Sequence, residues 1–183
     1  GQAFKAAIAG LQAKGDKKRV DVVLTNRDSY WARAYNAGIG SIGDAQKLLD
    51  AGVKDEAKAN FEKAIAKLTM AKLLKPDHAQ TIRNLATAYA LANRFDEAEA
   101  VLKNGQTEAA ADTSVYQLAE ALKTVRANKA GALLDAKDWD GAIGYYNQLA
   151  AAEPTNSDHF MGLGNAYFNR AQGKKDDARK ADY

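Results

Sequence analysis

One pattern of apolar, small and aromatic residues occurs twice in this sequence. It reads apolar-x2-Leu-small-x2-Tyr and covers residues 82–89 and 160–167. The two runs are 78 residues apart (163 − 85), and the prolines that precede them, Pro76 and Pro154, have the same offset (154 − 76). An internal repeat is therefore present. Its length accommodates two helix-pair units, with each proline ending one helix before the next begins.

The composition predicts an all-α protein. Hydrophobic residues make up 46% of the 183 residues and alanine is the commonest of them, while only 2 residues are proline. Alanine has the highest helix propensity, and β-branched residues are scarce outside residues 20–24. That segment fits a short strand or an extended connector equally well.

The repeated runs resemble the opening of a tetratricopeptide repeat, W-x2-L-G-x2-Y. The second helix of that repeat has the pattern A-x3-F, which resembles Ala57-x3-Phe61, Ala98-x3-Leu102 and Ala142-x3-Tyr146. The resemblance implies a right-handed α-α superhelix, a solenoid of antiparallel helix pairs. In such a solenoid we expect Ala86 and Gly164 on first helices, and Ala98 and Ala142 on second helices, to mark the close crossings. Large residues are expected to interlock around them: Ile82, Leu85, Tyr89, Phe95 and Leu102.

The resemblance divides one domain, residues 1–183, into units of about 29–78, 79–112, 113–156 and 157–183. The last unit is incomplete and stops in its second helix near Ala178, and residues 1–28 are a remnant of an earlier unit plus a connector. We expect helices over 29–52, 54–75, 113–136 and 139–152, the second of them about two turns longer than the family norm. Because residues 1–14 begin within an amphipathic helix, we expect the chain to be part of a longer protein.

Several kinds of site are disfavoured by the sequence. A net charge of +3 is too small and dispersed for a nucleic-acid surface, and 0 Cys excludes disulfides and thiolate metal sites. His78 and His159 lack a second ligand nearby, and residues 38–43 read G-x-G-x-x-G without the preceding strand that a dinucleotide site needs. No apolar stretch reaches the length of a membrane span. We therefore predict no catalytic residues, no cofactor, no metal, no nucleic-acid partner and no membrane insertion, in a soluble protein that is cytoplasmic or exported.

The resemblance also implies a function. In tetratricopeptide-repeat proteins the first helices line a concave groove that binds a peptide or a protein, so we expect a protein-interaction scaffold without catalysis. The alternatives are a regulatory or targeting domain of a larger enzyme or assembly machine and, less favoured, an RNA-binding repeat. Self-association through exposed terminal helices is also possible, and Glu99 and Lys103 on a second helix should face outward. The groove residues expected from the resemblance are Gln80, Arg83, Asn84, Thr87, Asn128, Asp158, Met161, Asn165, Phe168 and Asn169.

Overall fold

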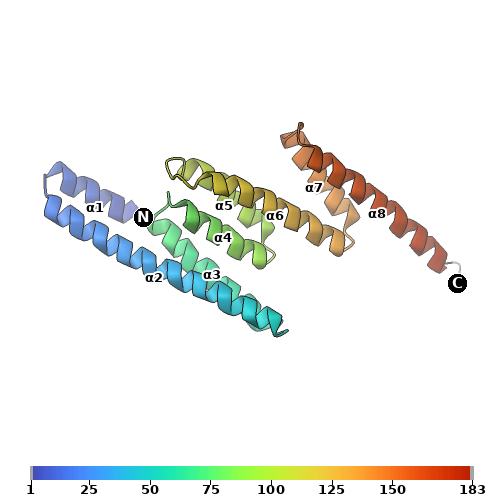
Figure 1. Cartoon of the computed structure of the whole chain (residues 1–183), viewed down its shortest axis with the longest axis horizontal. Coiled ribbons are helices and arrows are strands. Elements are labelled where there is room, and N and C mark those ends of the chain that lie inside the picture. The colour runs from blue at the N-terminus through green and yellow to red at the C-terminus, as the bar shows by residue number, and fades with distance from the viewer. Residues whose placement is uncertain (1, 182–183) are drawn as a thin grey trace. The chain divides into compact units, whose positions relative to one another are not determined.

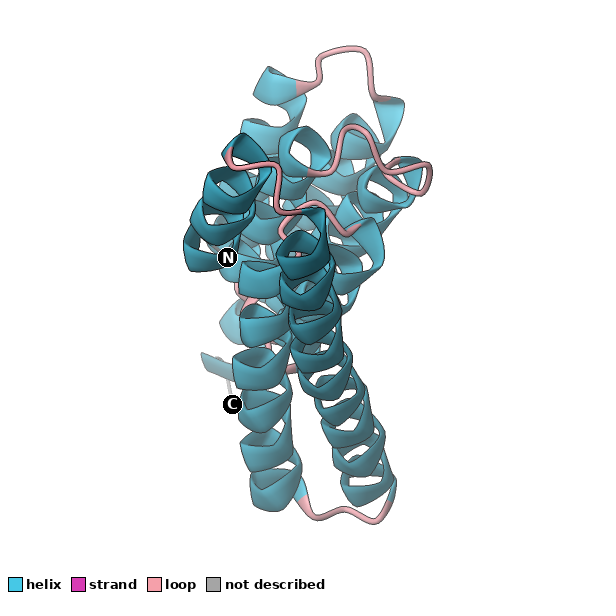
Figure 2. Cartoon of the chain, turned by 90° about the vertical axis from the view of Figure 1, so that its left-hand side faces the viewer, coloured by secondary structure: helices cyan, strands magenta, loops and turns pink. Residues whose placement is uncertain are grey.

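The computed structural model describes the backbone of residues 2–181 and the side chains of residues 3–173. Within this part of the chain all regular structure is α-helical, and no strand is present (Figure 2). The predicted all-α class is therefore confirmed.

The internal contacts of the chain divide it into two compact units, residues 1–125 and residues 126–183. Helix α6 (Tyr116–Asp135) crosses from the first unit into the second (Figure 1). The first unit also contains α1 (Gln2–Ala13), α2 (Lys17–Asp50), α3 (Lys54–Leu74), α4 (Ala79–Leu91) and α5 (Phe95–Glu108). The second unit also contains α7 (Trp139–Ala152) and α8 (Ser157–Ala181).

Helix α2 corrects the sequence interpretation of residues 20–24, which are neither a strand nor a connector. The helix begins twelve residues before the expected start at Ser29, because the Asp16 carboxylate caps it by accepting from the Arg19 N–H at 3.1 Å. Val20 is buried, and α2 packs along α1. A cap and tertiary packing together outweigh the modest helix cost of β-branched residues.

The G-x-G-x-x-G segment lies inside α2, and the helix passes through it without a break. Gly38 faces α3 so closely that a Cβ atom there would lie 2.6 Å from Leu68 Cγ. A Cβ atom on Gly40 or Gly43 would have no neighbour within 4 Å. The segment therefore serves helix packing at Gly38.

The core of the first unit is centred on α4. Ile82 and Leu102 are fully buried there, and a Cβ on Gly105 of α5 would come within 2.4 Å of Ile82 Cγ2. Burying a side chain of this size stabilises the fold by roughly 1.5–3 kcal/mol. The same cluster extends from α4 and α5 onto the first half of α6: Ala79, Ile82, Ala86, Ala98, Leu102, Ala109, Leu118, Leu122 and Val125.

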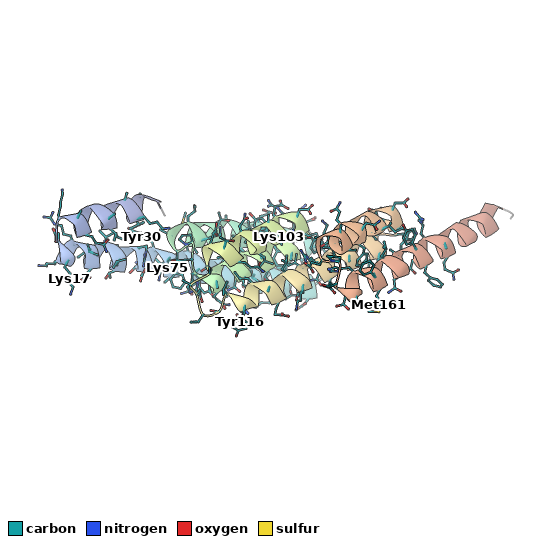
Figure 3. All side chains as sticks on the ribbon, turned by 90° about the horizontal axis from the view of Figure 1, so that it is seen from above. Lys17, Tyr30, Lys75, Lys103, Tyr116 and Met161 are labelled. Carbon is teal, nitrogen blue, oxygen red and sulfur yellow. The ribbon has the colours of Figure 1, made fainter. Side chains whose placement is uncertain are left out.

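One surface prediction on α5 is wrong. Glu99 is only 7% exposed, and its carboxylate forms an ion pair with Lys103, one helical turn away, at 3.2 Å. Glu99 lies one helical turn before the fully buried Leu102 and is therefore on the core side of α5. Only Lys103 keeps the outward orientation expected for both (Figure 3).

The short turns that reverse the chain share one backbone feature. Gly52, Asn93 and Lys137 each adopt a left-handed conformation, with φ of 79°, 59° and 59°. In each turn the next residue is the N-cap of the following helix, α3, α5 or α7. Gly15, with φ of 67° and followed by the α2 N-cap Asp16, has the same geometry, so four such turns occur in the described part of the chain, two of them with a glycine.

In the second unit, α8 packs against α7. Gly162 makes the close approach, because a Cβ there would lie 2.1 Å from Tyr146 Cε1. The predicted crossing residue Gly164 instead faces open space with nothing within 4 Å, so that assignment is wrong. Residues 157–181 also form one helix rather than the beginning of a pair. The crossing lies two residues earlier because Ala166 and Gly162, one turn apart, define the face that meets α7.

We predict opposite effects of the same substitution at two glycines of α8. Gly162→Ala should lower the free energy of unfolding by about 1–3 kcal/mol, since Tyr146 must move. Gly164→Ala should raise it by about 0.5–1 kcal/mol, since alanine favours the helix and meets no neighbour. Urea denaturation of both variants measures this difference. Equal effects would contradict the described α7–α8 packing.

A second prediction concerns the left-handed turn residues. Lys137→Gly should raise stability by about 0.5–1 kcal/mol, because glycine adopts a positive φ without the steric cost of a Cβ. Gly52→Ala should lower it by about 1–2 kcal/mol for the converse reason. Ala132→Gly, inside α6, is the control and should cost about 0.5–1 kcal/mol. Thermal unfolding is the measurement, and a loss of stability in Lys137→Gly would contradict the turn geometry.

Candidate partner-binding surface

Four of the predicted groove residues lie together on α4, and we call them the α4 surface: Gln80, Arg83, Asn84 and Thr87. All four side chains are exposed or half-buried. Gln80 Nε2 donates to Asn84 Oδ1 at 3.4 Å, and the Thr87 hydroxyl donates to the Arg83 carbonyl oxygen at 3.1 Å. These contacts follow the i, i+4 spacing that places side chains on one helix face.

The α4 surface is joined by hydrogen bonds to the helices on both sides of it. Asn84 Nδ2 donates to the hydroxyl oxygen of Tyr35 on α2 at 2.8 Å. Arg83 Nη1 donates to Oε1 of Gln117 on α6 at 2.8 Å. Within the first unit, polar side chains of α4 are therefore hydrogen-bonded to α2 and to the start of α6, and we call these contacts the α4 network.

An aromatic cluster beneath this network holds Tyr35. Its ring stacks on Trp31 with centroids 5.3 Å apart, and the Trp31 indole N–H donates to Thr81 Oγ1 at 3.1 Å. Lys75, labelled in Figure 3, places its Nζ 4.3 Å from the centre of the Trp31 ring and forms an ion pair with Asp28 at 3.1 Å. Trp31 therefore packs between helices. Because the Tyr35 ring stacks on it, the Tyr35 hydroxyl is held where it accepts from Asn84.

The start of α4 is fixed by His78, whose ring caps the helix. His78 Nδ1 accepts from the Thr81 N–H at 3.1 Å and lies 2.9 Å from the Thr81 hydroxyl. Burial lowers the pKa of this imidazole, because desolvation disfavours its charged form. His78 therefore has a structural role as the N-cap of α4.

Asp112 fixes the same helix start from the loop after α5. Its carboxylate accepts from the Ser114 N–H at 2.8 Å, the Ser114 hydroxyl at 2.7 Å and the Ala79 N–H at 2.9 Å. These hydrogen bonds, those from Ser114 foremost, lower the pKa of Asp112 to about 2. The loop and the first turn of α4 are thereby held together.

The remaining predicted groove residues lie in the second unit. Met161, Asn165 and Phe168 are exposed at i, i+4 and i+7 on one face of α8, and we call them the α8 surface. Met161 is 66% exposed and Phe168 62% (Figure 3 labels Met161). Asp158 and Asn169 flank this face, the first exposed and the second half-buried. Asn128 is exposed on α6, and no hydrogen bond joins it to the α8 surface among the described residues.

The orientation of α8 is set by Glu153, in the turn before it. The carboxylate pairs with Arg126 of α6, accepts from Asn156 Nδ2 at 3.2 Å and lies 3.0 Å from His159 Nε2. The Arg126 guanidinium, with His159 second, lowers the pKa of Glu153 to about 2. His159, like His78, has a structural place at the start of a helix.

Two residues of the network, Tyr35 and Gln117, are absent from the sequence prediction. Helix α6 lacks the repeat's opening pattern, so nothing in the sequence aligns Gln117 with Arg83. Tyr35 lies in a helix whose start the sequence placed twelve residues late. The one feature of the sequence that could have identified Tyr35 and Gln117 is that their side chains can form hydrogen bonds, and many surface residues share this capacity.

Among the described residues there is no group of three or more His, Asp or Glu side chains that could hold a metal ion. No helix in that part of the chain is both long enough and apolar enough to cross a bilayer. Comparison of the sequence with protein-family models and with curated proteins gives no match.

We predict that acid destabilises this protein in two separate steps. His78 has a lowered pKa, so the unfolded chain binds more protons below its ordinary value of 6.5 and stability falls as the pH drops through that value. Asp112 and Glu153 bind protons more readily in the unfolded chain, so their contribution to the free energy of unfolding is lost between about pH 4 and about pH 2.

Urea midpoints measured across this pH range test both steps. His78→Asn keeps a side-chain cap and should flatten only the step near pH 6.5. Glu153→Gln, in the second unit, should reduce only the lower step and is the control. A His78→Asn curve that superimposes on the wild-type curve would refute the role of His78.

Proposed function

We propose that this protein is a tetratricopeptide-like helical repeat that binds a peptide or protein partner on the first helices of its pairs and carries out no catalysis. The carrying observation is that corresponding positions of two first helices are both accessible, half-buried or exposed. With the offset of 78, Met161 corresponds to Arg83 and Asn165 to Thr87. All four side chains are accessible, while their neighbours Leu85 and Ala166 pack inward.

The α4 surface supplies polar recognition. Arg83 is held by Gln117, which uses one of the five N–H donors of its guanidinium, and no other side-chain hydrogen bond engages it among the described residues. Asn84 and Gln80 are similarly oriented by hydrogen bonds. A group that is oriented before binding loses less conformational entropy when it engages a ligand. Backbone carbonyls or a carboxylate of a peptide are the matching acceptors.

The α8 surface supplies apolar contact. Met161 and Phe168 expose flexible and aromatic surface on either side of Asn165. Methionine adapts its shape to different partners, and large aromatic residues often contribute most of the binding free energy at interfaces. A partner segment with apolar side chains suits this face.

We predict that substitutions on these two surfaces weaken binding without affecting folding. A display library of random peptides selects a ligand for the wild-type protein, and calorimetry then measures its Kd. Arg83→Glu combined with Phe168→Ala should cost about 2 kcal/mol or more of binding free energy if both are anchors. Unfolding curves should change little, because both side chains are accessible.

Matched controls come from α3, a second helix. Leu73 is 62% exposed, as is Phe168, so Leu73→Ala removes an equally accessible apolar side chain. Lys67→Glu reverses a charge as Arg83→Glu does, at an exposed position. If the peptide's Kd responds to the α3 pair and not to the Arg83 and Phe168 pair, the partner binds the second helices and the proposal fails.

A further inference from the structure

The first turn of α4 contains a hydrogen-bond arrangement that only the neutral form of His78 can complete. The Thr81 backbone N–H donates to His78 Nδ1 at 3.1 Å, so this nitrogen is an acceptor and carries no hydrogen. The Thr81 hydroxyl, 2.9 Å away, therefore donates to the same nitrogen. Its oxygen in turn accepts from the Trp31 indole N–H at 3.1 Å. Thr81 is fully buried, so its hydroxyl depends on these two side chains.

Protonation of His78 disrupts this arrangement, since both ring nitrogens of an imidazolium are donors. The Thr81 N–H would then face an N–H instead of an acceptor, and the buried Thr81 hydroxyl would lose the acceptor for its own hydrogen. Leaving a buried donor without a partner is unfavourable. The added charge would also lie at the N-terminus of α4, where the helix dipole disfavours a cation. Protonation of His78 and the observed first turn of α4 therefore oppose each other.

Charged groups from three segments surround the His78 ring. Lys75 at the end of α3 and Asp77 in the next turn lie on one side, and Asp112 lies in the loop after α5. Asp28 of α2 reaches this group through its ion pair with Lys75. Desolvation has the largest effect on the pKa of His78 and lowers it. The two aspartates beside the ring raise the pKa and Lys75 lowers it, with a net decrease that keeps the imidazole neutral in neutral solution.

His78 is connected to the α4 surface through the aromatic side chains of α2. The Trp31 ring lies 4.8 Å from the His78 ring and stacks on Tyr35 with centroids 5.3 Å apart. The Tyr35 ring is also edge-on to His78 at 6.3 Å, and its hydroxyl accepts from Asn84 Nδ2 at 2.8 Å. A change in the hydrogen bonds of Thr81 therefore reaches Asn84 through a continuous series of contacts.

We propose that His78 is a pH switch for the α4 surface: its neutral imidazole keeps Tyr35 and Asn84 in place for a partner, and its imidazolium releases them. This inference rests on the proposed function, because it concerns partner binding at the same surface. A partner that binds the ordered surface favours the neutral imidazole, so the complex binds fewer protons than the free protein. By linkage, partner affinity then rises with pH and decreases in mildly acidic solution.

Nuclear magnetic resonance of the free protein tests the switch without a partner. Between about pH 7.5 and about pH 5, where a histidine titrates, the Trp31 indole N–H signal and the Asn84 side-chain amide signals should shift together. Trp139, the other tryptophan, lies in the second unit and is the internal reference. His78→Asn keeps a capping oxygen and should abolish both shifts. A Trp31 signal that shifts while the Asn84 signals do not overturns the proposal, because the change would then stop at His78.

Calorimetry with a selected peptide that contains no histidine tests the regulation. The wild-type protein should bind it about fivefold or more weakly at about pH 5 than at about pH 7.5, and His78→Asn should bind equally at both. His159→Gln, at the other histidine of the chain, is the matched control and should keep the wild-type difference. Equal wild-type affinities, or a pH dependence that persists in His78→Asn, overturn the proposal. If no peptide binds at either pH, the proposed function fails, and the Trp31 and Asn84 signals still decide whether His78 controls this surface.

Discussion

Close packing of the helices depends on small residues placed where a large side chain of the next helix arrives. Gly38 receives Leu68, Gly105 receives Ile82 and Gly162 receives Tyr146, each at a distance that leaves no room for a Cβ. Because packed interiors tolerate little change in volume, these contacts fix which side of each helix faces its neighbour. The exposed side follows from that choice, so the accessible groups of α4 and α8 are a consequence of the crossings.

Polar contacts fix the starts of α4 and α8, in addition to the packing at the helix crossings. His78 and Asp112 define the first turn of α4, and Glu153 defines the first turn of α8. Each satisfies donors at or near a helix start or pairs with a basic side chain. The titratable groups with lowered pKa values in these turns are therefore explained by structure, although perturbed pKa values are often a sign of an active site.

The three faces of a first helix have separate uses. One face of α4, with Leu85 and Ala88, packs on α3 and α2, and a second, with Ile82 and Ala86, is covered by α5 and α6. The third carries Arg83 and Thr87 and is accessible. In α8 the first face packs on α7, while the other two are both accessible.

The sequence alone determined the helical class, the bounds of α7, the start of α3 and the buried state of Ala98, Leu102 and Ala142. These depend on local propensity, on prolines and on a pattern that repeats along the chain. Tertiary structure decided the rest. Residues 20–24 became helical through a cap and packing on α1, and Glu99 was drawn inward beside the core. The crossing lies at Gly162 rather than Gly164, and Arg83 pairs with Gln117, because both depend on which helix lies opposite, and periodicity within one helix carries no information about its neighbour.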